Sequence, residues 1–192
     1  MPSRLVRLHS SGQTHFITFS CWHNRRFFAD PSARHTFEAG LERIRRRFQL
    51  CVYGYVVMPD HIHLLLSEPH RGTLAEAIKS LKQGVARRLI NGCPTQASFA
   101  CVGEKAIHFW QKRYYDFNLR THSQFVEKLR YIHRNPVKRE LCARPEDWQW
   151  SSFRHYATGR EGPVEIESEW TARKRERAAG RLCPAIHIPT QA

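Results

Sequence analysis

The sequence predicts an α+β fold, a ferredoxin-like β-α-β-β-α-β sandwich followed by an additional helix and a C-terminal tail. Segments rich in β-branched and aromatic residues alternate in that order with segments whose apolar residues recur at helical spacing. The chain has 192 residues, of which 41% are hydrophobic, enough for one buried core. We therefore expect one antiparallel sheet with helices packed on one face.

A strand, a helix and a hairpin are expected in the first third of the chain. Residues 14–22 (THFITFSCW) suit a pleated, half-buried surface. Asp30 as N-cap and Pro31 at the first helical position begin a helix with one apolar face. Residues 50–58 and 61–67 are predicted as two strands, because the proline between them suits a tight turn and not a central strand.

The second half of the sandwich begins with a capping box, in which Thr73 and Glu76 cap a second helix with an apolar stripe. Residues 91–105 have the composition of a loop. Residues 107–110 and 114–119 are strand-like, and together they predict an irregular fourth strand.

A third helix is expected from about Ser123 to Asn135, because the residue before Pro136 is disfavoured in the α conformation. Beyond it, aromatic residues are interspersed with charged ones over residues 139–156. Residues 171–181 (TARKRERAAGR) predict a basic helix near the end of the chain.

The charge balance indicates a polyanionic partner. The chain has 31 Lys and Arg residues against 17 Asp and Glu, a formal net charge of +14, so binding should weaken with salt. It has no apolar run of membrane-spanning length and no secretory signal core, so we expect no membrane partner and a cytoplasmic location. Its six cysteines form no CxxC pair, which argues against a zinc ribbon.

The first candidate site is the pair His61 and His63 on the third expected strand. Side chains two residues apart on a strand point to the same face, so both imidazoles can bind one cation. Taken alone, such a pair is more often structural than a metal site. Here the strand continues with three leucines, and burying two ionisable rings beside them is unfavourable unless the rings have a function.

The second candidate is Tyr131 with Asn135, which lie one turn apart on the same face of the third helix. A phenolic nucleophile and an amide oxygen could then act at one site. Alternatively, Tyr131 is an ordinary core residue and Asn135 only ends the helix.

The third candidate is the aromatic and basic run at 109–115 (FWQKRYY). Its cations could contact phosphates and its rings could stack unpaired bases, as in single-strand binders. The candidate residues are Lys112, Arg113, Tyr114 and Tyr115. Either tyrosine could also be the nucleophile, although half of the rings in any strand must face the core.

Phosphate contacts are also expected from basic residues of the first two helices and of the tail. The helix candidates are Arg45, Arg46, Arg47, Arg87 and Arg88. For any single arginine, a solvated helix face is an equally good interpretation.

Three motifs, in order, resemble a known family. Residues 55–65 (YVVMPDHIHLL) resemble the signature strand of the single-tyrosine HUH transposases. Residues 135–138 (NPVK) and 144–153 (RPEDWQWSSF) resemble the segment after the catalytic helix in REP-associated tyrosine transposases, relatives tied to repetitive extragenic palindromes. The resemblance extends over about residues 14–156.

The resemblance assigns roles to the candidates. It implies that His61 and His63 bind a metal ion with Asn135 as the third ligand. It also implies that Tyr131 is the nucleophile. The tyrosines at 114–115 match a separate motif, WQxRYYD, and are expected to be structural or to contact DNA.

The implied reaction is cleavage and rejoining of single-stranded DNA beside palindromic, REP-type hairpins. Tyr131 would attack a phosphate polarised by Mg²⁺ or Mn²⁺ and leave a 5′-phosphotyrosine and a free 3′-hydroxyl, which retains the bond energy for strand transfer. Imidazole ligands alone do not identify the ion. The residues also permit a non-catalytic protein that binds hairpin nucleic acid, or a phosphodiesterase that activates water.

Single-stranded and hairpin DNA are thus the expected partners, with no small-molecule cofactor, in the cytoplasm at the nucleoid. The expected domains are a HUH transposase domain at 1–138 and a basic, aromatic-containing extension at 139–192. Both a monomer and a homodimer are compatible with the sequence. No role follows for His133.

Overall fold

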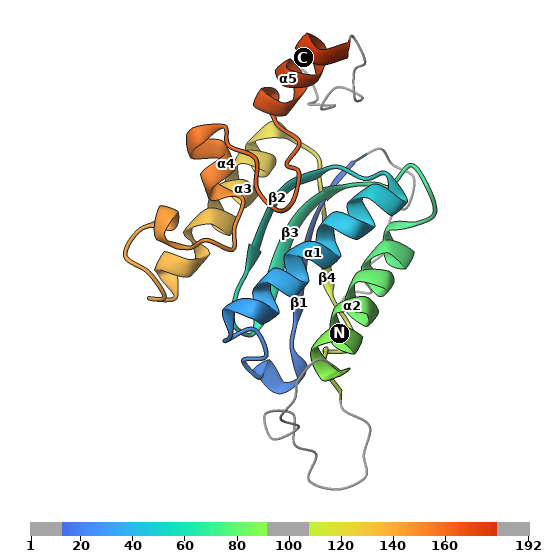
Figure 1. Cartoon of the computed structure of the whole chain (residues 1–192), viewed down its shortest axis with the longest axis vertical. Helices are drawn as coiled ribbons and strands as arrows, with labels where there is room; N and C mark the ends of the chain where they lie inside the picture. The colour runs from blue at the N-terminus through green and yellow to red at the C-terminus, as the bar shows by residue number, and fades with distance from the viewer. Residues whose placement is uncertain (1–12, 92–107, 180–192) are drawn as a thin grey trace, which may run out of the picture.

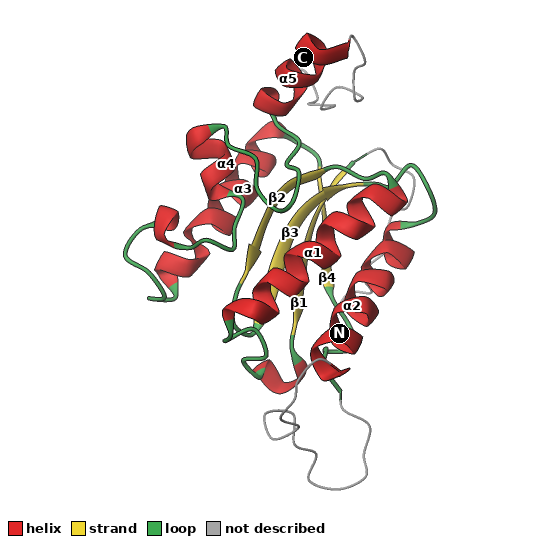
Figure 2. Cartoon of the chain, viewed as in Figure 1, coloured by secondary structure: helices red, strands yellow, loops and turns green. Residues whose placement is uncertain are grey.

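The computed structural model describes residues 13–91 and 108–179 (Figure 1). A four-stranded antiparallel sheet in the order β2-β3-β1-β4 lies at its centre (Figure 2). The strands are β1 (Thr14–Ser20), β2 (Val52–Val57), β3 (His61–Ser67) and β4 (Tyr115–Leu119). The helices are α1 (Pro31–Phe48), α2 (Leu74–Asn91), α3 (His122–Lys138), α4 (Phe153–Thr158) and α5 (Glu169–Ala179), with short 3-10 turns at Trp22–Asn24 and Pro145–Asp147. The predicted α+β class and β-α-β-β-α-β order are confirmed.

Side-chain caps start the first two helices. The carboxylate of Asp30 accepts a hydrogen bond from the backbone N–H of Ser32 at 2.7 Å. At the start of α2, the Thr73 hydroxyl accepts from the Glu76 N–H at 3.2 Å, and the Glu76 carboxylate accepts from the Thr73 N–H at 2.8 Å. Each cap satisfies N–H groups that have no partner within the helix, which fixes where the helix begins.

The two helices of the sandwich, α1 and α2, lie on one face of the sheet as expected, and the additional helix α3 covers the other face (Figure 1). On one face, α1 and α2 pack in a core that includes Ile62 and Leu64 of β3. On the other face, α3 packs over β2 and β3, and Leu65 belongs to a second core there. Because side chains alternate along a strand, His61 and His63 share the α3 face with Leu65.

The chain after α3 runs back along the outer edge of β2. The backbone N–H of Ser152 donates to the carbonyl of Tyr55 at 3.0 Å, and that of Glu167 donates to the carbonyl of Val52 at 2.8 Å. Trp148, from the same returning segment, is buried in the second core. The residues that follow α3 are therefore packed against the sandwich.

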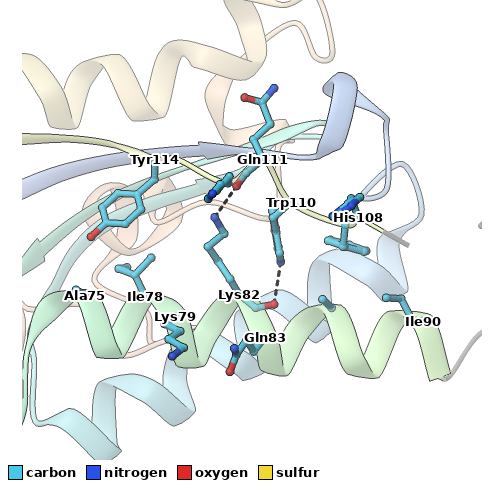
Figure 3. A pocket seen from close by; sticks show the side chains of 13 residues that line it. Ala75, Ile78, Lys79, Lys82, Gln83, Ile90, His108, Trp110, Gln111 and Tyr114 are labelled. Atoms are coloured by element: carbon cyan, nitrogen blue, oxygen red, sulfur yellow. Dashed lines mark hydrogen bonds between the residues drawn. The ribbon is translucent and has the colours of Figure 1, made fainter. Parts of the chain in front are cut away.

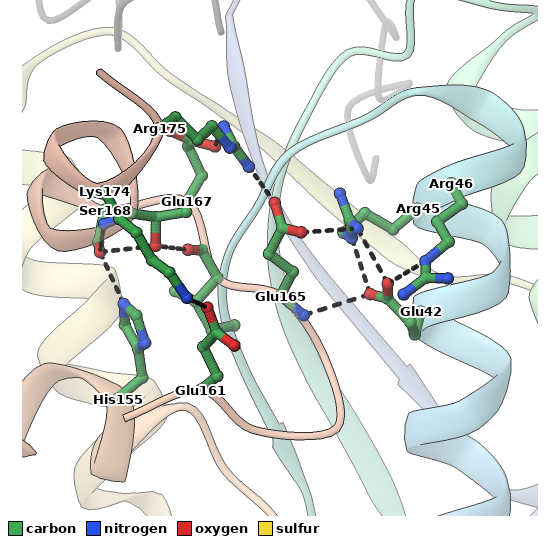
Figure 4. A network of polar contacts seen from close by, with 12 residues as sticks. Glu42, Arg45, Arg46, His155, Glu161, Glu165, Glu167, Ser168, Lys174 and Arg175 are labelled. Atoms are coloured by element: carbon green, nitrogen blue, oxygen red, sulfur yellow. Dashed lines mark hydrogen bonds and ion pairs between the residues drawn. The ribbon is translucent and has the colours of Figure 1, made fainter. Parts of the chain in front are cut away.

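Charged side chains tie α5 to α1 (Figure 4). Glu165 accepts hydrogen bonds from Arg45 of α1, at 3.1 Å, and from Arg175 of α5. Glu42 in turn accepts from Arg45 at 2.7 Å and from Arg46 at 2.5 Å. The carboxylates thus bridge two helices that are more than a hundred residues apart in the sequence.

The predicted end of α3 at Asn135 is wrong, because the helix continues to Lys138 with Pro136 inside it. Pro136 has no N–H to donate, yet the N–H of Arg139 reaches the carbonyl of Asn135 at 3.0 Å and that of Leu141 reaches the carbonyl of Pro136 at 3.0 Å. Asn135 and Pro136 are both buried. Their packing outweighs the local preference of the residue before a proline.

The fourth strand is shorter than predicted. β4 begins at Tyr115, and of residues 108–110 only Trp110 forms a bridge, with Cys21. Most of the predicted loop, residues 92–105, lies outside the described residues, as do the last two residues of the basic stretch predicted at 171–181. Within the described ranges, no helix is both long and apolar enough to cross a membrane.

Candidate active site

Two imidazoles meet at the start of β3. His61 and His63 are buried, with 6% and 4% of each residue exposed, and their Nε2 atoms lie 3.1 Å apart. β3 is an inner strand between β2 and β1, so its backbone is fixed on both sides. The sheet therefore holds the two rings together on the face that α3 covers.

Polar partners hold the outer nitrogens of both rings. Nδ1 of His61 lies 2.7 Å from a carboxylate oxygen of Asp60, and Nδ1 of His63 lies 2.7 Å from the hydroxyl of Thr18 in β1. The carboxylate accepts a hydrogen bond from Nδ1–H of His61, which leaves Nε2 as the nitrogen of that ring that faces His63. Histidines that bind metal ions are commonly oriented by such partners.

α3 adds Tyr131 and Asn135 to the pair. Nδ2 of the buried Asn135 donates to Nε2 of His63 at 3.0 Å, while its Oδ1 has no hydrogen-bond partner among the described residues. The ring of Tyr131 is edge-on to that of His63, with centroids 5.1 Å apart, and 38% of Tyr131 is exposed. The site is thus buried at the imidazoles and open at the phenol.

This set of donors fits a small divalent cation. Nε2 of His61 and Nε2 of His63 lie 3.1 Å apart, and the Asn135 amide that contacts Nε2 of His63 has a buried Oδ1 without a hydrogen-bond partner among the described residues. Burial, with the charges of His61 and Arg139, lowers the pKa of His63 to about 3, so its imidazole is neutral. No cluster of three His, Cys, Asp or Glu side chains suited to a metal exists in the described part of the chain. The candidate centre is therefore two imidazoles and an amide.

His133 anchors α3 on the other side of the helix. Its Nε2 lies 2.9 Å from the hydroxyl of Ser152, which also accepts the backbone N–H of Tyr55 at 3.1 Å. Burial lowers the pKa of His133 to about 4, so this ring too is neutral. These contacts join α3 to β2, the strand beside β3. His133 lies two residues from Tyr131 and two from Asn135, so on a helix it points to the opposite side. This spacing is the sequence signal for its role.

The two adjacent tyrosines at the start of β4 lie on opposite faces of the sheet. Tyr114 lines a pocket against α2 together with Lys112 and Ile78 (Figure 3). Tyr115 is 48% exposed and contacts Phe16 on the α3 face, with ring centroids 6.4 Å apart. Of the two rival tyrosines, only Tyr115 therefore shares a face with the histidine pair.

The arginines predicted to contact DNA on α1 and α2 lie on the layer opposite the histidines. Arg45 is bound to the carboxylates of Glu42 and Glu165. The exposed basic residues among those predicted to contact DNA are Arg46, Arg47, Arg87, Arg88, Lys112 and Arg113. Their contacts with DNA stay predictions.

Basic residues without a predicted role lie beside Tyr131. Nζ of Lys138 is 5.7 Å from the centre of the Tyr131 ring. Arg134 is exposed one turn along α3, and the charge of Arg139 acts on His63. Arg134 and Lys138 follow Tyr131 at helical spacing, which is the signal that identifies them.

Residues 9–135 match the protein family described as IS200-like transposases. The match covers about two thirds of the chain and includes His61, His63, Tyr131 and Asn135. The chain belongs to the IS200-like transposase family. This match confirms the family that the sequence motifs predict.

Individual relatives agree with this family. A Haemophilus influenzae protein described as a REP-associated tyrosine transposase is 33% identical over 98 residues, which are 50% of this chain and 55% of that protein. The Escherichia coli REP-associated tyrosine transposase is 23% identical over 151 residues, 79% of this chain and 82% of the relative. A solved REP-associated tyrosine transposase bound to a REP hairpin has a TM-score of 0.64 and 18% identity, covering 86% of this chain and 92% of its own. This last likeness confirms the fold.

Proposed function

We propose that this IS200-like transposase cleaves and rejoins single-stranded DNA beside palindromic, REP-type hairpins. Tyr131 is the nucleophile, and His61, His63 and Asn135 hold a divalent cation. The observation that carries the proposal is the meeting of these four side chains, from elements far apart in the sequence, at one end of β3. The REP-associated relatives and the hairpin-bound structural neighbour support this class of DNA substrate.

The residues around the cation position divide the chemistry between them. Mg²⁺ or Mn²⁺ bound there would supply Lewis-acid polarisation of the scissile phosphate. Asp60 and Thr18 orient the imidazoles so that both Nε2 atoms face inward. The neutral ring of His63 and the amide of Asn135 are uncharged ligands, so they would not neutralise the charge of a bound cation. That charge would stay available to attract a phosphate.

Tyr131 forms the covalent bond. The phenol releases its proton to water as its oxygen attacks phosphorus, and the bond from phosphorus to the 3′ oxygen breaks. That 3′ oxygen takes up a proton from water and leaves as a hydroxyl. His63 and Phe16 hold the Tyr131 ring edge-on at 5.1 and 5.9 Å, while its exposed side admits a strand. Because one phosphodiester replaces another, a second 3′-hydroxyl can reverse the step without ATP.

A denaturing gel tests the proposal. A labelled single-stranded oligonucleotide that contains a REP-type hairpin and its flanks, incubated with the protein and Mg²⁺ or Mn²⁺, should give a protein–DNA band. Chelation with EDTA should prevent the band. Tyr131→Phe should abolish the band and leave DNA affinity nearly unchanged, because only a hydroxyl is lost. Tyr115→Phe, which removes a hydroxyl from the same face, is the matched control and should retain the band.

Other outcomes contradict the proposal in distinct ways. Loss of the band in Tyr115→Phe but not in Tyr131→Phe would identify Tyr115 as the nucleophile. Cleaved DNA without a covalent band would indicate a phosphodiesterase that uses activated water. Binding without cleavage would leave a hairpin-binding protein, the function that the high positive charge would still support.

A further inference from the structure

A row of aromatic rings leads from β4 to Tyr131 on the α3 face of the sheet. Tyr115 and Phe117, two residues apart on β4, are stacked, with ring centroids 6.4 Å apart and an interplanar angle of 5°. Phe16 of β1 lies between this pair and the site. Its ring centroid is 6.4 Å from that of Tyr115 and 5.9 Å from that of Tyr131.

Tyr115 is the exposed end of this row. Among the described residues, the large hydrophobic side chains that are exposed are Tyr115 at 48%, Tyr131 at 38% and Trp170 at 58%. Two of the three therefore belong to one row of rings. Exposed apolar surface that gathers beside a reactive group is typical of a binding site.

A cation accompanies the rings. Nζ of Lys128 on α3 lies 5.5 Å from the ring centre of Phe16 and 5.7 Å from that of Phe117. Its ion-pair partner, Glu127, is largely exposed, so water weakens that pair and a phosphate can compete for the lysine. Flat rings with an adjacent ammonium group match the two parts of a nucleotide, the base and the phosphate.

We propose that Tyr115 and Phe117 form a stacking platform for one unpaired base of the DNA strand that enters the site, with Lys128 at the neighbouring phosphate. This inference rests on the proposed function, since it gives the substrate strand a path from β4 to Tyr131. An unpaired base in a flank can turn its face onto the rings, whereas a base inside a duplex is held between its neighbours, so the platform selects a single-stranded flank over paired DNA. The ring of Tyr115 is needed for this role and its hydroxyl is not.

Equilibrium binding without cleavage tests the platform. In a Tyr131→Phe background, fluorescence anisotropy compares a labelled hairpin that has a single-stranded flank with the same hairpin cut blunt. Tyr115→Ala should weaken binding of the flanked hairpin by about tenfold and leave the blunt hairpin unaffected. Tyr115→Phe should bind like the parent. Tyr115→Leu keeps apolar bulk on β4 without an aromatic face, so it should bind like Tyr115→Ala if stacking is the cause.

Single abasic sites along the flank then locate the base. One position should weaken binding to the parent and cause no further loss in Tyr115→Ala. Equal weakening of both hairpins by Tyr115→Ala, or full affinity of Tyr115→Ala and Tyr115→Leu for the flanked hairpin, would overturn the platform. The covalent band reports on the proposed function separately: preference for the flank without any band would refute the nucleophile and leave the platform standing.

Discussion

At the scale of single residues, a buried charge pair joins β1 to β4 on the face opposite the site. His15 is 1% exposed, with its Nδ1 2.8 Å from the carboxylate of Asp116 and its Nε2 3.5 Å from that of Glu68. Burial alone would lower the pKa of His15. The hydrogen bond and charge of Asp116, aided by Glu68, outweigh burial and raise this pKa above its ordinary value.

The raised pKa of His15 predicts a pH-dependent stability. Its contribution is full below the unfolded pKa of about 6.5 and is lost as the pH rises through the folded value. Asp116→Asn removes the charged partner, so it should lower the free energy of unfolding by about 1.5–3 kcal/mol at acid pH and by less above neutrality. Urea unfolding of both proteins from about pH 5.5 to about pH 8.5 measures this difference.

A second background provides the control for this prediction. With His15→Gln already present, Asp116→Asn should have an effect that does not change across the same pH range. A constant difference between the wild-type protein and Asp116→Asn would contradict the assigned pair.

At the scale of elements, the position of α3 on the sheet depends on Gly54 of β2. A Cβ at this position would lie 2.7 Å from Cδ1 of Leu129 on α3 and 3.5 Å from the hydroxyl oxygen of Ser152. The first distance is inside van der Waals contact, so either α3 or the Leu129 side chain must move. The absence of a side chain at Gly54 lets the helix that carries Tyr131 approach the strand beside β3.

Gly54→Ala should therefore lower the free energy of unfolding by about 1–3 kcal/mol and slow formation of the covalent band, because Tyr131 moves with α3. Leu129→Ala removes the obstructing methyl group, so Gly54→Ala should be nearly neutral in that background. Urea unfolding and the rate of band formation check both effects. If the two substitutions lower the free energy of unfolding additively, the contact between Gly54 and Leu129 does not set the position of α3.

Local sequence signals predict most of the helices and strands but not how these pack against one another. The end of α3 could not be predicted locally, because burial of Asn135 and Pro136 is a tertiary effect that overrides the preference before a proline. Helical periodicity identifies the apolar face of α3 but not the sheet face that it covers. The approach of Tyr131 to the histidine pair was therefore expected from family resemblance, and the position of Tyr115 beside the site depends on the β1–β4 register, which no local pattern encodes.

At the scale of the whole molecule, exposed basic residues of the described helices lie on both sides of the sheet. Basic residues of α3, such as Arg134, lie on the side of the histidines, whereas Arg88 and its neighbours on α2 lie on the other. Both arginines are exposed residues of long helices, so they form a matched pair. Substituting each arginine in turn shows on which side of the sheet DNA binds.

If DNA lies over α3, Arg134→Ala should reduce the slope of log affinity against log salt by about 0.7–0.9, the share of one phosphate contact. Arg88→Ala should leave the slope unchanged. Anisotropy titrations of a hairpin with a single-stranded flank, from about 50 to about 300 mM salt, measure both slopes. A reduced slope for Arg88→Ala would extend the DNA contact to α2, as its sequence suggests.

The chain that returns along β2 has a consequence beyond the site. Unpaired backbone groups at the edge of an open sheet invite strands from other molecules and so promote aggregation. Ser152 and Glu167 occupy such groups along β2, and in the described part of the chain the other edge strand is β4. The domain boundary at residue 138 stays a prediction, but a protein shortened there would lose this cover. The segment that follows α3 thus also keeps this edge of the sheet from pairing with other copies of the chain.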